Sequence, residues 1–196
     1  VVTRLKNDAL QRALVQLQTN TSGLIVELIV MEGVYDTQQL APLFNFSSVT
    51  TAAEVRLTGD KRISDGITAA CPSTCATIFR ELPIYVFPTA PRVVLRRIVF
   101  EMYTSTPVIT ISGSSVHILD SSFRDNKEGA IYMEETAGAL VPFLEVINTT
   151  FERNGPHYLA GDCRYDDRGQ CGALAPYKNG RGAELHGGRA AIAECT

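Results

Sequence analysis

Apolar and polar positions repeat with a helical period over the first twenty residues. The apolar positions recur at three- and four-residue steps, at Leu5, Ala9, Leu10, Ala13, Leu14 and Leu17. This spacing places them on one face of a helix. The pattern ends at residues 19–23 (TNTSG), a composition typical of a loop. The sequence therefore predicts an amphipathic helix within residues 1–22.

After residue 23 the helical period gives way to short apolar runs. They are separated by clusters of Gly, Pro, Asn, Asp and Ser, as is typical of strands. The runs cover residues 24–31, 53–57, 84–87, 93–100, 108–111, 116–119, 130–133, 144–147 and 190–193. We therefore expect an all-β architecture behind the N-terminal helix.

Some of these strands belong to an internal repeat. Residues 115–126 align with residues 143–154, and both contain an apolar strand, Asp or Asn, two hydroxyl residues and then Phe-x-x-Asn. A third copy begins at residue 190 and stops one residue before its expected Phe, and a weaker copy covers residues 93–100 without the Asn. Repeats of this length, made of short strands, predict a solenoid.

The repeat favours a parallel β-helix, in which each coil stacks on the preceding one. We expect Phe100, Phe123 and Phe151 to form an inward aromatic column, and Asn126 and Asn154 to turn the chain in a left-handed conformation. The helix in residues 1–22 would cap the open end. Coils would fill residues 23–196, with inserts near 60–80 and 155–180, and would continue beyond residue 196. An antiparallel sandwich is the alternative.

Several of these segments resemble known families. Residues 24–28 (LIVEL) and 32–35 (EGVY), after the helix, resemble the entry of right-handed parallel β-helices of the pectin-lyase-like class. Residues 123–126 (FRDN) with 129–132 (GAIY), and 151–154 (FERN) with Gly182 and Ala183, resemble the repeats of polymorphic outer-membrane proteins and of large secreted surface proteins of bacteria and algae. Glu128 and Arg181 replace the first Gly of the second motif. The resemblance implies a right-handed parallel β-helix and a surface scaffold.

Charge and hydropathy exclude some partners. The net charge is −3, and the 18 Lys and Arg residues are scattered along the chain, which argues against a nucleic acid or an anionic membrane as partner. The longest apolar run, at residues 24–31, is far shorter than the ~20 residues of a membrane span.

Glycosylation triplets and cysteines indicate the secretory pathway. N-x-Ser/Thr triplets begin at Asn20, Asn45 and Asn148. Four cysteines lie in polar, loop-like segments, so we expect disulfides among Cys71, Cys75, Cys163 and Cys171, with the pairing left open. Cys195 is left unpaired or has a partner outside this segment. These features predict an extracellular or cell-surface glycoprotein.

Candidate chemistry is sparse. Asp162, Asp166 and Asp167 lie in the insert near 155–180 that contains Cys163 and Cys171, where they form either a weak calcium site or a solvated loop. A glycosidase needs two carboxylates across the scissile bond, and a rigid site would draw them from successive coils. His117 is interpreted as a structural strand residue, and Arg92, Arg96 and Arg97 as a polar strand face or a site for an acidic polysaccharide. With no Trp, sugar stacking would fall to Tyr35, Tyr85, Tyr103 and Tyr132.

The sequence thus predicts a non-catalytic structural or adhesive module of a larger secreted or cell-surface glycoprotein, as a wall, fibre or appendage component. Its partners would be other subunits, further coils of the same polypeptide or a polysaccharide. No cofactor is expected besides N-linked glycans, with calcium as an option. The alternatives are a polysaccharide lyase or glycoside hydrolase of the β-helix class, and a glycan- or calcium-binding module.

Overall fold

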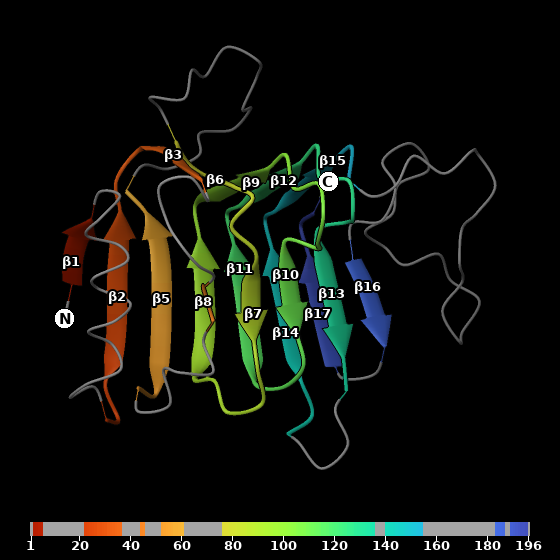
Figure 1. Cartoon of the computed structure of the whole chain (residues 1–196). Coiled ribbons are helices and arrows are strands. Elements are labelled where there is room, and N and C mark those ends of the chain that lie inside the picture. The colour runs from red at the N-terminus through yellow and green to blue at the C-terminus, as the bar shows by residue number, and fades with distance from the viewer. Residues whose placement is uncertain are drawn as a thin grey trace.

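The computed structural model describes residues 2–5, 22–36, 44–45, 52–60, 76–135, 140–154, 183–186 and 189–195. These residues form three sheets in which every strand pair is parallel (Figure 1). Sheet A contains β1 (Val2–Leu5), β2 (Ile25–Val30), β5 (Glu54–Gly59), β8 (Arg92–Arg96), β11 (Ser115–Leu119), β14 (Phe143–Ile147) and β17 (Arg189–Ala193). Sheet B contains β3 (Gly33–Asp36), β6 (Thr77–Arg80), β9 (Ile98–Glu101), β12 (Ser122–Arg124) and β15 (Thr150–Glu152). Sheet C contains β4 (Phe44–Asn45), β7 (Ile84–Val86), β10 (Ile109–Ile111), β13 (Ile131–Glu134) and β16 (Ala183–His186).

The chain visits the sheets in a fixed cycle. From β2 onward the order is sheet A, then B, then C, and each strand pairs with the strand one cycle earlier and one cycle later. One cycle is therefore one coil, and the molecule is a parallel β-solenoid. The all-β expectation is confirmed for the described residues, and the antiparallel sandwich is wrong.

The strand register follows the internal repeat. Ser115 lies opposite Phe143, and Phe123 lies opposite both Phe100 and Phe151. In the third copy, Leu144 lies opposite Ala190. The repeat was therefore aligned in the correct register, and it marks positions that stack from coil to coil.

Two predicted elements differ in the structure. The expected strand at residues 93–100 is broken at Arg97, whose φ of 56° is left-handed, so it becomes β8 in sheet A and β9 in sheet B. The predicted N-terminal helix is wrong over Val2–Leu5, which form β1 parallel to β2. Residues 6–21 lie outside the described residues. Among the described residues, no helix is long and apolar enough to cross a membrane.

The core lies between the three sheets and is built by strand alternation. In β11, Val116 and Ile118 are fully buried, and in β14 the corresponding Leu144 and Val146 are also fully buried. The short strands of sheet B contribute one aromatic residue each, such as Phe123 in β12. These strands, of three or four residues each, are too short for their alternation to be recognised as strand periodicity.

Sharp corners join the sheets and rely on left-handed residues other than glycine. These residues are Arg97, Asp120, Asn148 and Glu194 between sheets A and B, Glu81, Met102, Asp125 and Arg153 after sheet B, and Ser114 before β11 of sheet A. The amide of Asp120 donates to the Ile147 carbonyl of the next coil, and the amide of Asn148 donates to the Ala193 carbonyl, each at 3.1 Å. The corners therefore also bind successive coils together.

Asn126 and Asn154 do not adopt the left-handed conformation expected for them. The left-handed residue in each case is the one before, Asp125 with a φ of 57° and Arg153 with a φ of 51°. Asn126 and Asn154 are instead almost completely buried, because their side chains bond to the neighbouring coils.

Candidate functional site

An aromatic column runs through the inside of sheet B. Its members lie in register on successive coils and are Tyr35, Phe79, Phe100, Phe123 and Phe151. The ring of Phe123 stacks on Phe100 at 4.7 Å and on Phe151 at 5.0 Å between centroids. The predicted column of three thus extends by two rings, which meet their neighbours edge to face at 5.7 Å.

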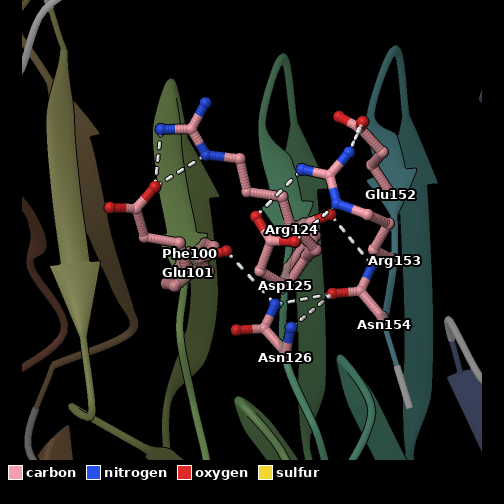
Figure 2. A network of polar contacts seen from close by, with 9 residues as sticks. Phe100, Glu101, Arg124, Asp125, Asn126, Glu152, Arg153 and Asn154 are labelled. Carbon is pink, nitrogen blue, oxygen red and sulfur yellow. Dashed lines mark hydrogen bonds and ion pairs between the residues drawn. The ribbon is translucent and has the colours of Figure 1, made fainter. Parts of the chain in front are cut away.

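Two buried side-chain amides, Asn126 and Asn154, stand three residues after Phe123 and Phe151 and form a ladder (Figure 2). The Asn126 side chain accepts from the Tyr103 amide at 3.1 Å, and it donates to the Phe100 carbonyl at 3.2 Å and to Asn154 Oδ1 at 2.7 Å. Asn154 in turn donates to the Phe123 carbonyl at 2.9 Å. Each Asn therefore satisfies backbone groups of the coil before it.

The same position is occupied by other residues in earlier coils. Tyr103 stands three residues after Phe100, is fully buried, and donates its hydroxyl proton to the Leu82 carbonyl at 2.8 Å. Burial raises the pKa of Tyr103 well above its ordinary value. Leu82 takes the position in the coil before. The position three residues after the aromatic therefore changes from apolar Leu82 to polar Tyr103, Asn126 and Asn154 along the solenoid.

A column of alternating charge lies on the outside of sheet B, one residue after the aromatic column. Its members are Asp36, Arg80, Glu101, Arg124 and Glu152, which are in register. Glu101 receives a hydrogen bond from Arg80 Nε at 2.7 Å and another from Arg124 Nε at 2.6 Å. Its carboxylate is almost fully buried between the two guanidinium groups. The charges thus serve to bind coils.

We expect Glu101→Gln to reduce the free energy of unfolding by about 1–2 kcal/mol, because it leaves two arginines without their shared carboxylate. The loss stays moderate since both arginines reach solvent. Urea unfolding measures the change. Glu152→Gln, at a more exposed site of the same column, is the matched control and should change stability by less than about 0.5 kcal/mol. An equal effect of the two substitutions would disprove the buried role of Glu101.

The corner after sheet B carries an exposed bidentate pair. Arg153 donates to Asp125 from Nε at 2.6 Å and from a terminal nitrogen at 3.0 Å, and it also contacts Glu152. These hydrogen bonds from Arg153 lower the pKa of Asp125, with the guanidinium charge adding to the effect. Figure 2 shows the pair beside the amide ladder.

This pair predicts a small pH-dependent contribution. Because the Asp125 pKa is lower in the folded protein than its unfolded value of about 3.9, the pair stabilises above that value and the effect disappears as pH falls through the folded pKa. Arg153→Gln should therefore cost less than about 1 kcal/mol at pH 7, and this cost should shrink as the pH falls through the folded pKa of Asp125. Denaturant titrations of both proteins from pH 7 to pH 2 measure this difference. A constant difference across that range would contradict the assignment.

The outer face of sheet A holds the polar network nearest to a chemical site. Arg56 and Arg92 both contact the carboxylate of Glu54. On the next strands, His117 Nδ1 lies 2.6 Å from Glu145 Oε2 and 3.4 Å from an Arg92 nitrogen. The His117 side chain is mostly buried, and its ring contacts Phe143.

The carboxylates of Glu54 and Glu145 both contact basic side chains, so this network links neighbouring strands of sheet A. Arg96 is similarly paired with Asp120 at 3.0 Å, which leaves less free positive charge for an acidic polysaccharide than the sequence suggested. Among the described residues, no group of three His, Cys, Asp or Glu could hold a metal ion.

The remaining predicted site residues divide into three groups. Asn148 is exposed at the corner between sheets A and B, and its side chain donates to Asp120 Oδ1 at 2.9 Å. Burial alone would raise the pKa of Asp120. The hydrogen bonds from Asn148 and Arg96 outweigh this effect, so the pKa of Asp120 is lowered. Asn45 ends β4. The others lie outside the described residues, and these are Asn20, Cys71, Cys75, Cys163, Cys171, Asp162, Asp166 and Asp167.

Two of the four tyrosines expected for sugar stacking are unavailable. Tyr35 and Tyr103 are inside the solenoid, with exposed fractions of 1% and 0%. Burial raises the pKa of Tyr35 to about 12. Tyr85 and Tyr132 are half-buried on strands β7 and β13 of sheet C.

Cys195 occupies a repeated corner position. The register of sheet A places it in line with Thr149 and Ser121, which are both buried. Ser121 and Thr149 each donate to the carbonyl two residues earlier, and the Cys195 sulfur is 3.2 Å from the equivalent Ala193 carbonyl. Burial raises the pKa of its thiol. Cys195 has no disulfide partner among the described residues and is an inward corner residue.

Comparisons with known proteins add no assignment. No protein-family model, no curated protein and no solved structure matches this chain.

Proposed function

We propose that this chain is a rigid, non-catalytic β-solenoid module with a structural or adhesive role in a larger secreted or cell-surface glycoprotein. It would act as a spacer or assembly unit of a wall, fibre or appendage. The finer fold we propose is a right-handed parallel β-helix, since crossovers between parallel strands are right-handed in about 98% of cases. This agrees with the resemblance to pectin-lyase-like and polymorphic outer-membrane repeats.

One observation carries the proposal: polar groups of the described coils bind coil to coil. The buried amide of Asn126 bonds to the coils on both sides, and the carboxylate of Glu101 bridges arginines of the coils on both sides. Successive coils are thus joined by the backbone hydrogen bonds of the sheets and by the stacked aromatic column. They are also joined by the amide hydrogen bonds of Asn126 and by the ion pairs of Glu101. Such cross-linking favours a stiff rod with variable outer loops.

The secretory assignment rests on the sequence. We propose N-linked glycans at Asn20, Asn45 and Asn148 and disulfides among Cys71, Cys75, Cys163 and Cys171. The exposed corner position of Asn148 supports the first part, since a glycan there would project away from the core. Peptide mapping of native material should find both modifications. Unmodified asparagines together with free thiols at these cysteines would overturn the secretory assignment.

The enzyme alternative is testable on the same protein. A panel of neutral and acidic polysaccharides should release neither reducing nor unsaturated sugars when incubated with the purified chain. Turnover that disappears in Glu145→Gln or His117→Ala, but persists in Glu152→Gln, would overturn the non-catalytic role. His117 and Glu145 are the appropriate targets because a histidine and a carboxylate could act together as an acid and a base, and the two side chains lie 2.6 Å apart.

A further inference from the structure

The outer face of sheet C differs in chemistry from the outer faces of sheets A and B. Those two faces carry arginines that are paired with carboxylates, such as Arg92 in β8 and Arg124 in β12. In β7, β10 and β13, which lie side by side in sheet C (Figure 1), the inward residues are apolar and at most 2% exposed. The outward residues of these three strands are aromatic, hydroxyl-bearing or acidic, and none is basic: Tyr85, Thr110, Tyr132 and Glu134.

Two tyrosines on this face are in register two coils apart. Thr110 lies opposite Tyr85 on one side and opposite Tyr132 on the other. All three side chains are half-buried, so each also reaches solvent. Because neighbouring strands of a sheet lie about 4.8 Å apart, the two tyrosines stand roughly 10 Å apart along the solenoid axis, with a hydroxyl between them.

Neighbouring groups hold both tyrosine rings in place. The Tyr85 ring lies nearly parallel to that of Phe87, with 6.1 Å between centroids and 13° between planes. The Tyr132 hydroxyl donates to Glu134 Oε2 at 3.1 Å. A tyrosine offers a large amphipathic contact surface, and a ring already held in place loses little conformational entropy on binding. The two rings therefore form a preorganised pair.

This chemistry fits a neutral sugar chain. The apolar face of a sugar ring packs on an aromatic ring, and its hydroxyls bond to groups such as the hydroxyl of Thr110 and the carboxylate of Glu134. In an extended β-1,4-linked chain, alternate sugars present the same face, and their repeat is close to the spacing of two coils. An acidic polysaccharide would instead meet Glu134 and no basic residue of β7, β10 or β13.

We propose that the outer face of sheet C is a binding site for a neutral, extended β-1,4-linked polysaccharide that runs along the solenoid axis. Tyr85 and Tyr132 contact every second sugar, and Thr110 contacts the sugar between them. The proposal rests on the adhesive form of the proposed function, since it names the partner of that role.

Isothermal titration calorimetry with sugar hexamers tests the proposal. A β-1,4-linked hexamer of glucose or of mannose should bind more tightly than the α-1,4-linked glucose hexamer, which is equally neutral but not extended, and than a galacturonate hexamer. Tyr85→Ala and Tyr132→Ala should each weaken binding about tenfold, because each removes a stacking ring. Tyr85→Phe and Tyr132→Phe keep the rings and should bind like the wild type.

Two further variants guard against a general loss of structure. Phe143→Ala removes a half-buried ring from the outer face of sheet A and should leave binding unchanged. Thr110→Gln keeps both tyrosines but places a longer side chain between them, so it should weaken binding even where an alanine variant does not fold.

Binding of neither β-1,4-linked hexamer would overturn the proposal, as would equal binding of the α-1,4-linked hexamer or an unchanged affinity in both alanine variants. Self-association of the chain that Tyr85→Ala or Tyr132→Ala abolishes would overturn it too, since that result assigns the face to a second copy. Release of reducing sugars in the same samples would overturn the non-catalytic function without affecting the binding readout. Failed binding, in turn, leaves the structural role and the secretory test untouched.

Discussion

Phe123→Ala is expected to reduce the free energy of unfolding by about 3–5 kcal/mol, the range for removing a buried aromatic ring. Phe123 is fully buried and is the central ring of three stacked phenylalanines, so its loss leaves a cavity facing both Phe100 and Phe151. The strands around it are held in register by sheet B and can close the cavity only in part. Equilibrium unfolding in urea, with the midpoint and slope both fitted, measures the loss.

Two control variants are needed. One keeps most of the side-chain volume at position 123, and the other removes a ring that lies outside the core. Phe123→Leu keeps most of the volume and should cost less than about 1.5 kcal/mol. Phe143→Ala removes a half-buried ring from the outer face of sheet A and should cost less than about 1 kcal/mol. If Phe143→Ala destabilised the protein as much as Phe123→Ala, the column would not be the core of the solenoid.

Asn126→Ala is expected to cost about 2–4 kcal/mol, because it removes an amide that bonds to three groups at once. The Tyr103 amide and the Phe100 carbonyl would both lose a partner inside the protein, where water does not replace it. The free energy of unfolding from urea titration measures this effect, and hydrogen exchange at the Tyr103 amide should accelerate at the same time.

We expect the destabilisation by Asn126→Ala to come from lost hydrogen bonds rather than from lost side-chain volume. Asn126→Asp has the same size but replaces the donor toward Phe100 and Asn154 with an oxygen, so it should be at least as destabilising as Asn126→Ala. Asn148→Gly, at an exposed left-handed corner, should stay within about 0.5 kcal/mol of the wild type. A stable Asn126→Asp protein would contradict the ladder.

The fold was largely predictable because the repeat preserves residue types at stacked positions. Phe123 and Phe151 both follow two hydroxyl residues and both precede an Asn by three positions, so their alignment gave the correct register. Phe79 was missed because residues 60–76 separate β6 from β5, so no apolar strand directly precedes it as one does in the later coils. Tyr35 was missed because its ring is not a Phe. The solenoid was thus recognised from its later coils alone.

The role of the asparagines was not predictable from residue type. Asp125 and Asn126 are adjacent, and both residue types tolerate left-handed backbone. Only the direction of the Asn126 side chain, which points inward to the neighbouring coil, decides that Asp125 forms the corner.

The charge column carried a usable signal that a search for motifs within one coil overlooks. The residue after each aromatic alternates in sign, at Arg80, Glu101, Arg124 and Glu152. The pairing of Arg96 required the register itself, since its partner Asp120 is 24 residues away on the next coil. Charges that seem free along the chain are therefore paired once the coils stack.

Force spectroscopy along the solenoid axis tests the central claim most directly. Handles would be attached at the two ends of the chain, beyond β1 and β17. We predict stepwise extension in which each step releases about one coil, of 21, 23 or 28 residues for the middle coils and of 44 or 46 residues from Tyr35 to Phe79 and from Phe143 to Arg189. These coils correspond to roughly 70–160 Å of contour. Asn126→Ala should yield at lower force. Extension without steps, at the force that stretches an unfolded polypeptide, would contradict a rigid module built from stacked coils.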